Sequence, residues 1–105
     1  MNAVDRYTPA LLEEIKSVIN VTWEDEFTEK KITAIVEDGM SFLDRIAGKQ
    51  LNFEEPGEAK RLLKNYCRYA YAGAESEFKS DYQSDLAALN INSQIEEREK
   101  KKNEK

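Results

Sequence analysis

The aromatic-rich segment of residues 61–91 is the feature that most limits how this chain can fold. It holds four of the five tyrosines in the sequence. Successive residues of an α-helix turn by about 100°, so its apolar residues can be assigned to faces. One face carries Leu63, Cys67, Ala70, Tyr71, Ala74, Phe78 and Tyr82. A second stripe carries Leu62, Tyr66, Tyr69 and Gly73. A helix that only covers its own small core needs one stripe. Two stripes therefore predict a helix covered from two sides, and the second cover could be another copy of the protein.

The composition favours a small all-α domain. The chain has 105 residues, 40% of them hydrophobic, with four glycines and two prolines. This scarcity of turn residues argues against an all-β fold. We expect residues 1–91 to form one helical domain. Residues 92–105 form a charged C-terminal tail with one apolar residue, which predicts disorder or ordering on a partner.

Helical spacing and end signals predict a bundle of three to four helices. The first covers about residues 9–19, with Thr8 as N-cap and Pro9 in the first position. The second has its main apolar run from Lys31 and ends at Gly48. Its N-cap is either Thr22 or Thr28, which lie on the two sides of the acidic residues 24–26.

A glycine inside the apolar face of this second helix, Gly39, predicts the close approach of another helix. Residues 49–56 form a loop that Leu51 and Phe53 anchor onto the core. A long third helix then starts near Glu58 and reaches Phe78 or beyond. We expect it to break near Ser80 and to resume through Leu86, Leu89 and Ile91. The resumed part is either a fourth helix or a continuation of the third.

The residues that carry most enzyme chemistry are missing or scattered. The sequence has no histidine and one cysteine, Cys67, which excludes zinc patterns, a Cys–His nucleophile and an internal disulfide. Carboxylates cluster at residues 24–26, 37–38 and 54–55, but their spacing matches no calcium loop. We expect no enzyme activity, no catalytic residues, no metal and no cofactor.

Charge and hydropathy limit the partners. The formal net charge is −5, so nucleic-acid binding rests on a short basic patch and the tail lysines. The patch consists of Lys60, Arg61, Lys64 and Arg68. No signal-peptide pattern and no apolar run long enough to span a bilayer occur in the sequence, which predicts a cytosolic protein without a membrane partner.

The order of these segments resembles one protein family. After the short first helix come VTWEDEFTEKKITAIVEDGMSFLDRIAG, the loop LNFEEPGEAKRLL and then NYCRYAYAGAESEFKSDYQSDLAALNI. This order is similar to that of the small head–tail connector, or head-completion, proteins of tailed bacteriophages and prophages, over about residues 8–91. The matching motifs are diffuse and include no catalytic signature.

The resemblance implies an assembly role. Members of this family form a ring, commonly of twelve copies, that docks beneath the portal protein and presents a surface to the next neck, stopper or tail protein. DNA passes through the middle without specific binding, and an acidic chain suits such a lumen. The implied location is the virion neck after assembly and the bacterial cytoplasm before it. The C-terminal segment of related connectors reaches toward the portal.

Two sets of residues follow as predicted sites. The subunit interface of the ring is predicted at Leu62, Tyr66 and Tyr69. The partner-binding tail is predicted at Ile95, Arg98, Lys100, Lys101 and Lys102. Two other interpretations stay open: a small cytosolic α-helical interaction or regulatory module, which predicts a homo-oligomer such as a dimer, and a nucleic-acid binder that uses the basic patch and the tail lysines.

Overall fold

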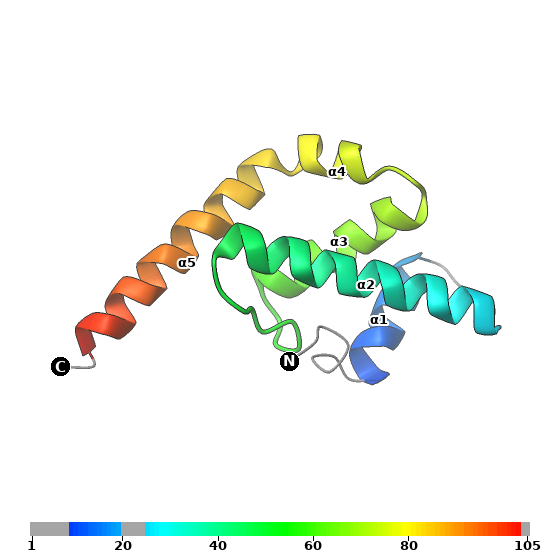
Figure 1. Ribbon diagram of the computed structural model, residues 1–105, viewed down its shortest axis with the longest axis horizontal. Helices are drawn as coiled ribbons and strands as arrows, with labels where there is room; N and C mark the ends of the chain where they lie inside the picture. Colours follow the sequence, from blue (N-terminus) through cyan, green and yellow to red (C-terminus); the bar gives the residue numbers. More distant parts are fainter. Residues whose placement is uncertain (1–8, 20–24, 104–105) are drawn as a thin grey trace.

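The described part of this chain consists of five consecutive helices and the loops between them. The computed structural model describes residues 9–19 and 25–103. The helices are α1 (Pro9–Ile19), α2 (Glu26–Ala47), α3 (Glu58–Tyr71), α4 (Glu75–Asp81) and α5 (Gln83–Asn103) (Figure 1). These two ranges contain no strand. The all-α class and the small bundle are therefore confirmed, with five helices in place of the expected three to four.

The first helix matches its predicted bounds, and charged groups tie it to both neighbours. Lys16 forms an ion pair with Glu29 of α2, and Lys60 Nζ of α3 lies 2.6 Å from the Glu14 carboxylate. Leu11 and Ile15 are buried one turn apart on the face toward the core. The predicted N-cap Thr8 lies outside the described residues.

The second helix begins at Asp25, an N-cap that differs from the two predicted ones. Asp25 Oδ1 accepts a hydrogen bond from the Thr28 backbone N–H at 2.8 Å, and the Thr28 hydroxyl donates to Asp25 Oδ2 at 3.0 Å. The expectation that Thr28 is the cap is wrong, because the aspartate oxygens satisfy the first turn; Thr22 lies outside the described residues. The predicted end at Gly48 is confirmed, with φ at 75° in the left-handed region.

Close contact between α2 and α3 occurs at Gly39, as predicted. A β-carbon placed on Gly39 would lie 2.8 Å from Tyr66 Cδ1 and 2.9 Å from Leu63 Cδ1. Both distances are well inside van der Waals contact. Glycine therefore allows the ring of Tyr66 and the end of Leu63 to rest directly on the backbone of α2.

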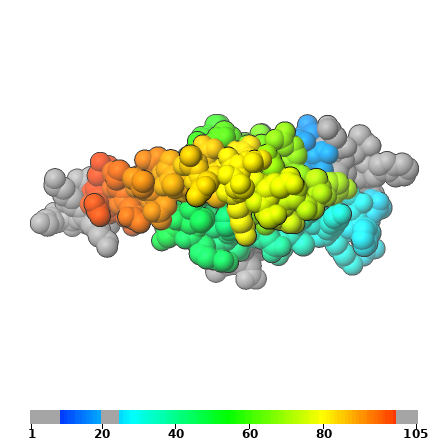
Figure 2. All heavy atoms as spheres, turned by 90° about the horizontal axis from the view of Figure 1, so that it is seen from above, coloured from blue at the N-terminus to red at the C-terminus, as the bar shows by residue number. Residues whose placement is uncertain are grey.

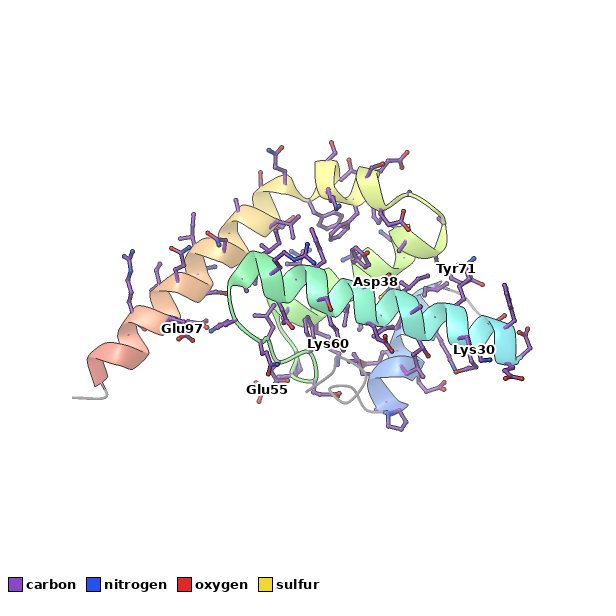
Figure 3. All side chains as sticks on the ribbon, viewed as in Figure 1. Lys30, Asp38, Glu55, Lys60, Tyr71 and Glu97 are labelled. Carbon is purple, nitrogen blue, oxygen red and sulfur yellow. The ribbon has the colours of Figure 1, made fainter. Side chains whose placement is uncertain are left out.

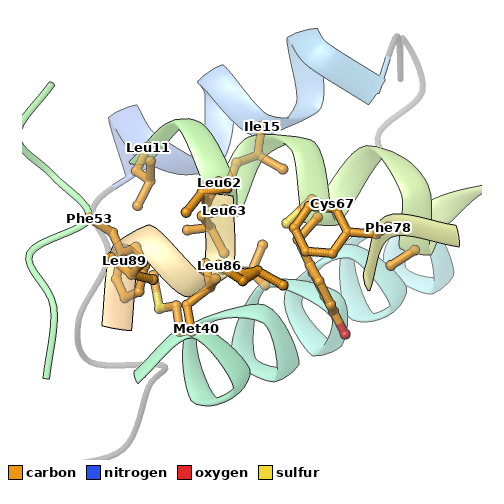
Figure 4. Packing of buried hydrophobic residues seen from close by; sticks show 14 of the residues in the cluster. Leu11, Ile15, Met40, Phe53, Leu62, Leu63, Cys67, Phe78, Leu86 and Leu89 are labelled. Carbon is orange, nitrogen blue, oxygen red and sulfur yellow. The ribbon is translucent and has the colours of Figure 1, made fainter. Parts of the chain in front are cut away.

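The core shows what covers the two stripes of the aromatic-rich helix. α3 lies between α1 and α2, with Leu62 and Leu63 fully buried among side chains of both (Figure 4). The predicted coverage from two sides is confirmed. The suggestion that a second copy supplies the other cover is wrong for Leu62 and Tyr66, because helices of the same chain already bury them.

The third helix ends earlier than predicted. Its last residue is Tyr71 rather than Phe78, and Gly73 follows with φ at 76°. Backbone N–H groups of Gly73 and Ala74 close the end by donating to the carbonyls of Ala70 and Tyr69. The expected break near Ser80 is confirmed at Tyr82, between α4 and α5. The chain thus bends twice after α3, where the sequence predicted one break.

The loop between α2 and α3 is anchored as predicted. Phe53 is fully buried in the core. The Leu51 backbone N–H donates to Asp44 Oδ1 at 2.9 Å, which ties the loop to the last turns of α2. Asn52 Oδ1 accepts from the Glu54 backbone N–H at 2.9 Å.

The last helix gives the molecule an elongated shape. α5 leaves the body beyond the end of α2 (Figure 1). From above, α4 and α5 form a yellow-to-orange ridge along one face (Figure 2). The radius of gyration is 14.6 Å, against about 13 Å for a compact chain of this length. The C-terminal tail, for which the sequence predicts disorder or ordering on a partner, continues α5 as a helix to Asn103. Among the described helices, none is long and apolar enough to cross a membrane.

Replacing Gly39 with alanine tests the contact between α2 and α3. Overpacking against Tyr66 and Leu63 typically costs about 1–3 kcal/mol, whereas the gain in helix propensity is about 1 kcal/mol. We expect Gly39→Ala to lower the free energy of unfolding in urea by about 1 kcal/mol net. Ser41→Ala, on the exposed side of α2, is the control and should be neutral or stabilising. A stabilised Gly39→Ala protein would contradict the close contact.

Candidate functional site

Two of the three predicted interface residues, Tyr66 and Tyr69, belong to an aromatic cluster inside the subunit. The Phe78 ring of α4 lies 5.4 Å from Tyr66 and 5.7 Å from Tyr69, centroid to centroid, both edge-on. Phe42 of α2 stacks on Tyr66 at 5.8 Å, and Tyr82 stacks on Phe78 at 4.7 Å. Edge-on and offset contacts of this kind stabilise a core beyond the area that they bury. The cluster therefore joins α2, α3 and α4.

This placement corrects part of the interface prediction. Leu62 has 0% of its surface exposed and Tyr66 8%, so neither can contact a neighbouring subunit in this conformation. The physical reason is the bend after Tyr71, which brings Phe78 back over α3 to cover the stripe. Tyr69 is half-buried and keeps an accessible edge.

A hydrogen bond sets the chemistry of Tyr69. Its hydroxyl donates to Asp81 Oδ2 at 3.0 Å, and this bond to a carboxylate raises the pKa of Tyr69. Burial is the main cause that raises the pKa of Tyr66. Both phenols therefore keep their protons at neutral pH, which suits packing and hydrogen bonding rather than proton transfer.

The single cysteine is inert in this environment. Cys67 is fully buried on α3, and desolvation raises the pKa of its thiol to about 12. A nucleophilic or redox-active cysteine needs a thiolate near neutral pH, so Cys67 acts as a small apolar core residue. In the described ranges, no three His, Cys, Asp or Glu side chains gather in a way that could hold a metal ion.

Two of the four cations of the predicted basic patch, Lys60 and Arg61, are paired with acids. Lys60 pairs with Glu14, and Arg61 Nη2 lies 3.1 Å from the Asp85 carboxylate of α5 and also contacts Glu58. Beside it, a groove of about 470 Å³ is lined by residues of α1, α3 and the loop before α3, including Glu14, Lys60 and Lys64. A phosphate-binding surface needs cations that are free to displace counterions. This arrangement argues against nucleic-acid binding at the patch.

An apolar strip on α5 is exposed in the part of the chain that the structure describes. Ile91 is 57% exposed and Ile95 46%, and Ala88 precedes them by one turn on the same side. Leu86, Leu89 and Ser93 are the buried residues of α5 and lie on its opposite side. We call Ala88, Ile91 and Ile95 the outer strip. A helix with apolar residues on two opposite sides, one of them open to solvent, is typical of an interaction surface.

Polar contacts hold α5 so that the outer strip faces away from the body. Asn90 Nδ2 donates to the Ile46 carbonyl at the end of α2 at 2.8 Å. Lys49 Nζ lies 2.7 Å from the Glu96 carboxylate and 3.9 Å from that of Glu97 (Figure 3). These contacts all lie on one side of α5, since Asn90 and Glu97 share its inner face. The orientation of the strip is therefore set by the body of the subunit.

The predicted partner-binding tail lies on this same helix. Ile95 belongs to the outer strip, and the exposed Arg98 follows it by three residues. The backbone of Lys100, Lys101 and Lys102 continues α5, and their side chains lie outside the described set. The sequence analysis named Ile91 only as part of the last helix and did not name Ala88 as a site residue. The 3–4 spacing of residues 84, 88, 91, 95 and 98 was the signal that could have found the strip.

Comparisons with protein-family models, with curated proteins and with solved structures found no match to this chain. The interpretation of its surface therefore rests on the residues themselves.

The raised pKa values of Cys67 and Tyr66, which are due to burial, and of Tyr69, which is due to its hydrogen bond to Asp81, predict a loss of stability at alkaline pH. The unfolded thiol loses its proton near the ordinary pKa of 9.0, whereas the folded thiol keeps it to about 12. The unfolded chain thus binds fewer protons above pH 9, so the free energy of unfolding falls as pH rises, by up to about 1.4 kcal/mol per pH unit from this group. The two tyrosines, whose pKa values are raised, add to the fall near their ordinary value.

Urea unfolding of wild type and Cys67→Ala between pH 7 and pH 10.5 measures this slope. The alanine variant should be less stable at pH 7, because a small cavity replaces the sulfur. Its stability should then fall less steeply between pH 9 and pH 10 than that of the wild type. Equal slopes would mean that Cys67 is accessible to solvent in the folded protein.

Proposed function

We propose that this chain is a structural subunit of the head–tail connector of a tailed bacteriophage or prophage, which assembles as a ring beneath the portal protein and links the DNA-filled head to the next neck or tail protein. The observation that carries the proposal is the outer strip on α5, held away from the body with a basic segment at its end. An exposed apolar strip of this kind suits a protein partner. The buried cysteine and the packed tyrosines offer no alternative role in catalysis.

The fold supports this role in further ways. The all-α bundle agrees with the class that the family resemblance implies. The net charge of −5 suits a lumen through which DNA slides, because like charges repel. Tyr69 remains a predicted contact to a neighbouring subunit, since it is only half-buried. The proposed location is the virion neck after assembly and the host cytoplasm before it.

A second candidate function is a small homo-oligomeric interaction or regulatory module. The outer strip would also serve such a protein, in which the partner is a second copy or a regulator. A gene position between capsid and tail genes favours the connector, whereas a position away from phage genes favours the module.

Docking on the portal is tested by mixing the purified chain with the portal protein of the same phage or prophage and imaging by electron microscopy. A ring of added density beneath the portal is expected. Arg98→Glu reverses a charge beside the outer strip and should weaken docking by at least about tenfold, or about 1.4 kcal/mol. Lys30→Glu makes the same charge change at the far end of the molecule, near the start of α2 (Figure 3), and should leave docking unchanged. Bare portals after mixing with wild type would contradict the proposal.

A further inference from the structure

One buried side chain fastens α4 to the rest of the fold. Between Ala70, near the end of α3, and Leu86, near the start of α5, Phe78 is the only buried residue, and the other six residues of α4 are exposed. By contrast, α3 buries five side chains, and α5 is attached through Leu86 and Leu89. We call residues 72–83 the strap. Because local stability follows the number of buried apolar contacts, the strap is held less firmly than the helices on either side of it.

The remaining contacts of the strap lie at the surface. The Tyr69 hydroxyl donates to Asp81 Oδ2 at 3.0 Å in an exposed position. Lys79 Nζ lies 5.2 Å from the centroid of the Phe42 ring, and Lys79 is exposed. Contacts of this kind stabilise little where water competes for the same groups. The closed position of the strap therefore depends on the Phe78 ring.

The helix inside the strap cannot persist without that ring. α4 has seven residues, and its N-cap Ala74 offers no side-chain hydrogen bond. Isolated helices shorter than about 12–15 residues are marginal in water, because nucleation is costly. When Phe78 leaves the aromatic cluster, nothing else in α4 supports the helix. The strap therefore opens as one unit.

The two ends of the strap are suited to act as hinges. Gly73 has φ at 76°, and a β-carbon placed on it would meet no other atom within 4 Å. Tyr82 is the single residue that separates α4 from α5 (Figure 1). Beyond these hinges, Ala70 and Leu86 are buried, so the end of α3 and the start of α5 stay in place.

We propose that the strap opens about Gly73 and Tyr82 while α2, α3 and α5 keep their fold, and that opening uncovers the aromatic surface of Phe42 and Tyr66. The closed strap is an autoinhibitory contact, since it leaves Tyr66 only 8% exposed. Any contact that needs this surface forms only with the open state, so its apparent affinity is reduced by the fraction of open molecules. This inference goes beyond the connector proposal, because opening is a property of the free chain and needs no portal.

Hydrogen exchange of the wild type at low urea concentrations tests the opening. The backbone N–H groups of Glu77 and Phe78 donate to the Ala74 carbonyl. We expect them to exchange at a rate that hardly depends on urea, because strap opening exposes little surface. The amides of α3 and those around Leu89 should exchange at least about tenfold more slowly, with the steep urea dependence of global unfolding. If α4 exchanges only together with α3 or with α5, the proposal is overturned.

A matched pair of glycine substitutions tests the hinge. Alanine resists the left-handed conformation, so Gly73→Ala should raise the exchange rate of the α4 amides about tenfold. Gly48→Ala introduces the same strain at the end of α2, where φ is 75° and the space is also open, and should leave the α4 amides unchanged. Equal α4 rates in Gly73→Ala and wild type would overturn the hinge.

Nitration by tetranitromethane, read by mass spectrometry, tests what the strap covers. Modification of Tyr66 should rise in Gly73→Ala in parallel with the exchange of α4, and not in Gly48→Ala. Unchanged nitration of Tyr66 in Gly73→Ala would show that the strap does not control access to this surface, and would overturn the proposal. Docking on the portal would in that case still support the connector.

Discussion

The contact of α2 with α3 at Gly39 is the constraint on which the rest of this structure depends. Because glycine has no side chain, Tyr66 and Leu63 rest on the backbone of α2, less than 3 Å from where a β-carbon would be. This places the Tyr66 ring beside Phe42 and exposes a flat aromatic surface to the next segment of chain. Phe78 covers that surface, and a direct continuation of α3 could not deliver it there. The bend after Tyr71 is what brings Phe78 onto that surface.

The two bends at Gly73 and Tyr82 in turn decide which residues are left for function. They bring α5 against the end of α2, where Asn90 and Lys49 hold it. One side of α5 completes the core and the other carries the outer strip. The outer strip is therefore a consequence of how the core closes. It lies on a helix whose direction is set by the contacts of Asn90 and Glu96 with the body.

Much of the fold could be predicted from the sequence where local chemistry dominates. The bounds of α1, the end of α2 at Gly48 and the start of α3 at Glu58 depend on proline, glycine and the spacing of nearby apolar residues. The end of α3 could not be predicted in this way, because residues 70–74 are mostly alanine and favour helix. The contact of Phe78 with Tyr66 and Tyr69 and the hydrogen bond from Tyr69 to Asp81 stabilise the bend, and both depend on residues beyond it. The N-cap at Asp25 was missed because Thr22 and Thr28 offered caps on either side of it, although aspartate is itself a preferred N-cap.

The sequence by itself determined that the aromatic-rich helix must be covered on two sides, since amphipathicity depends only on the order of residues along one helix. Tertiary structure alone decided what provides the cover. Leu62 and Tyr66 face helices of their own chain, because the loop anchored by Phe53 and the ion pair between Glu14 and Lys60 bring α1 and α2 to either side of α3. The same closure turned Ile91 and Ile95 outward. An apolar stripe on a helix predicts that another surface covers it. The path of the chain in space decides whether that surface belongs to the same chain or to another one.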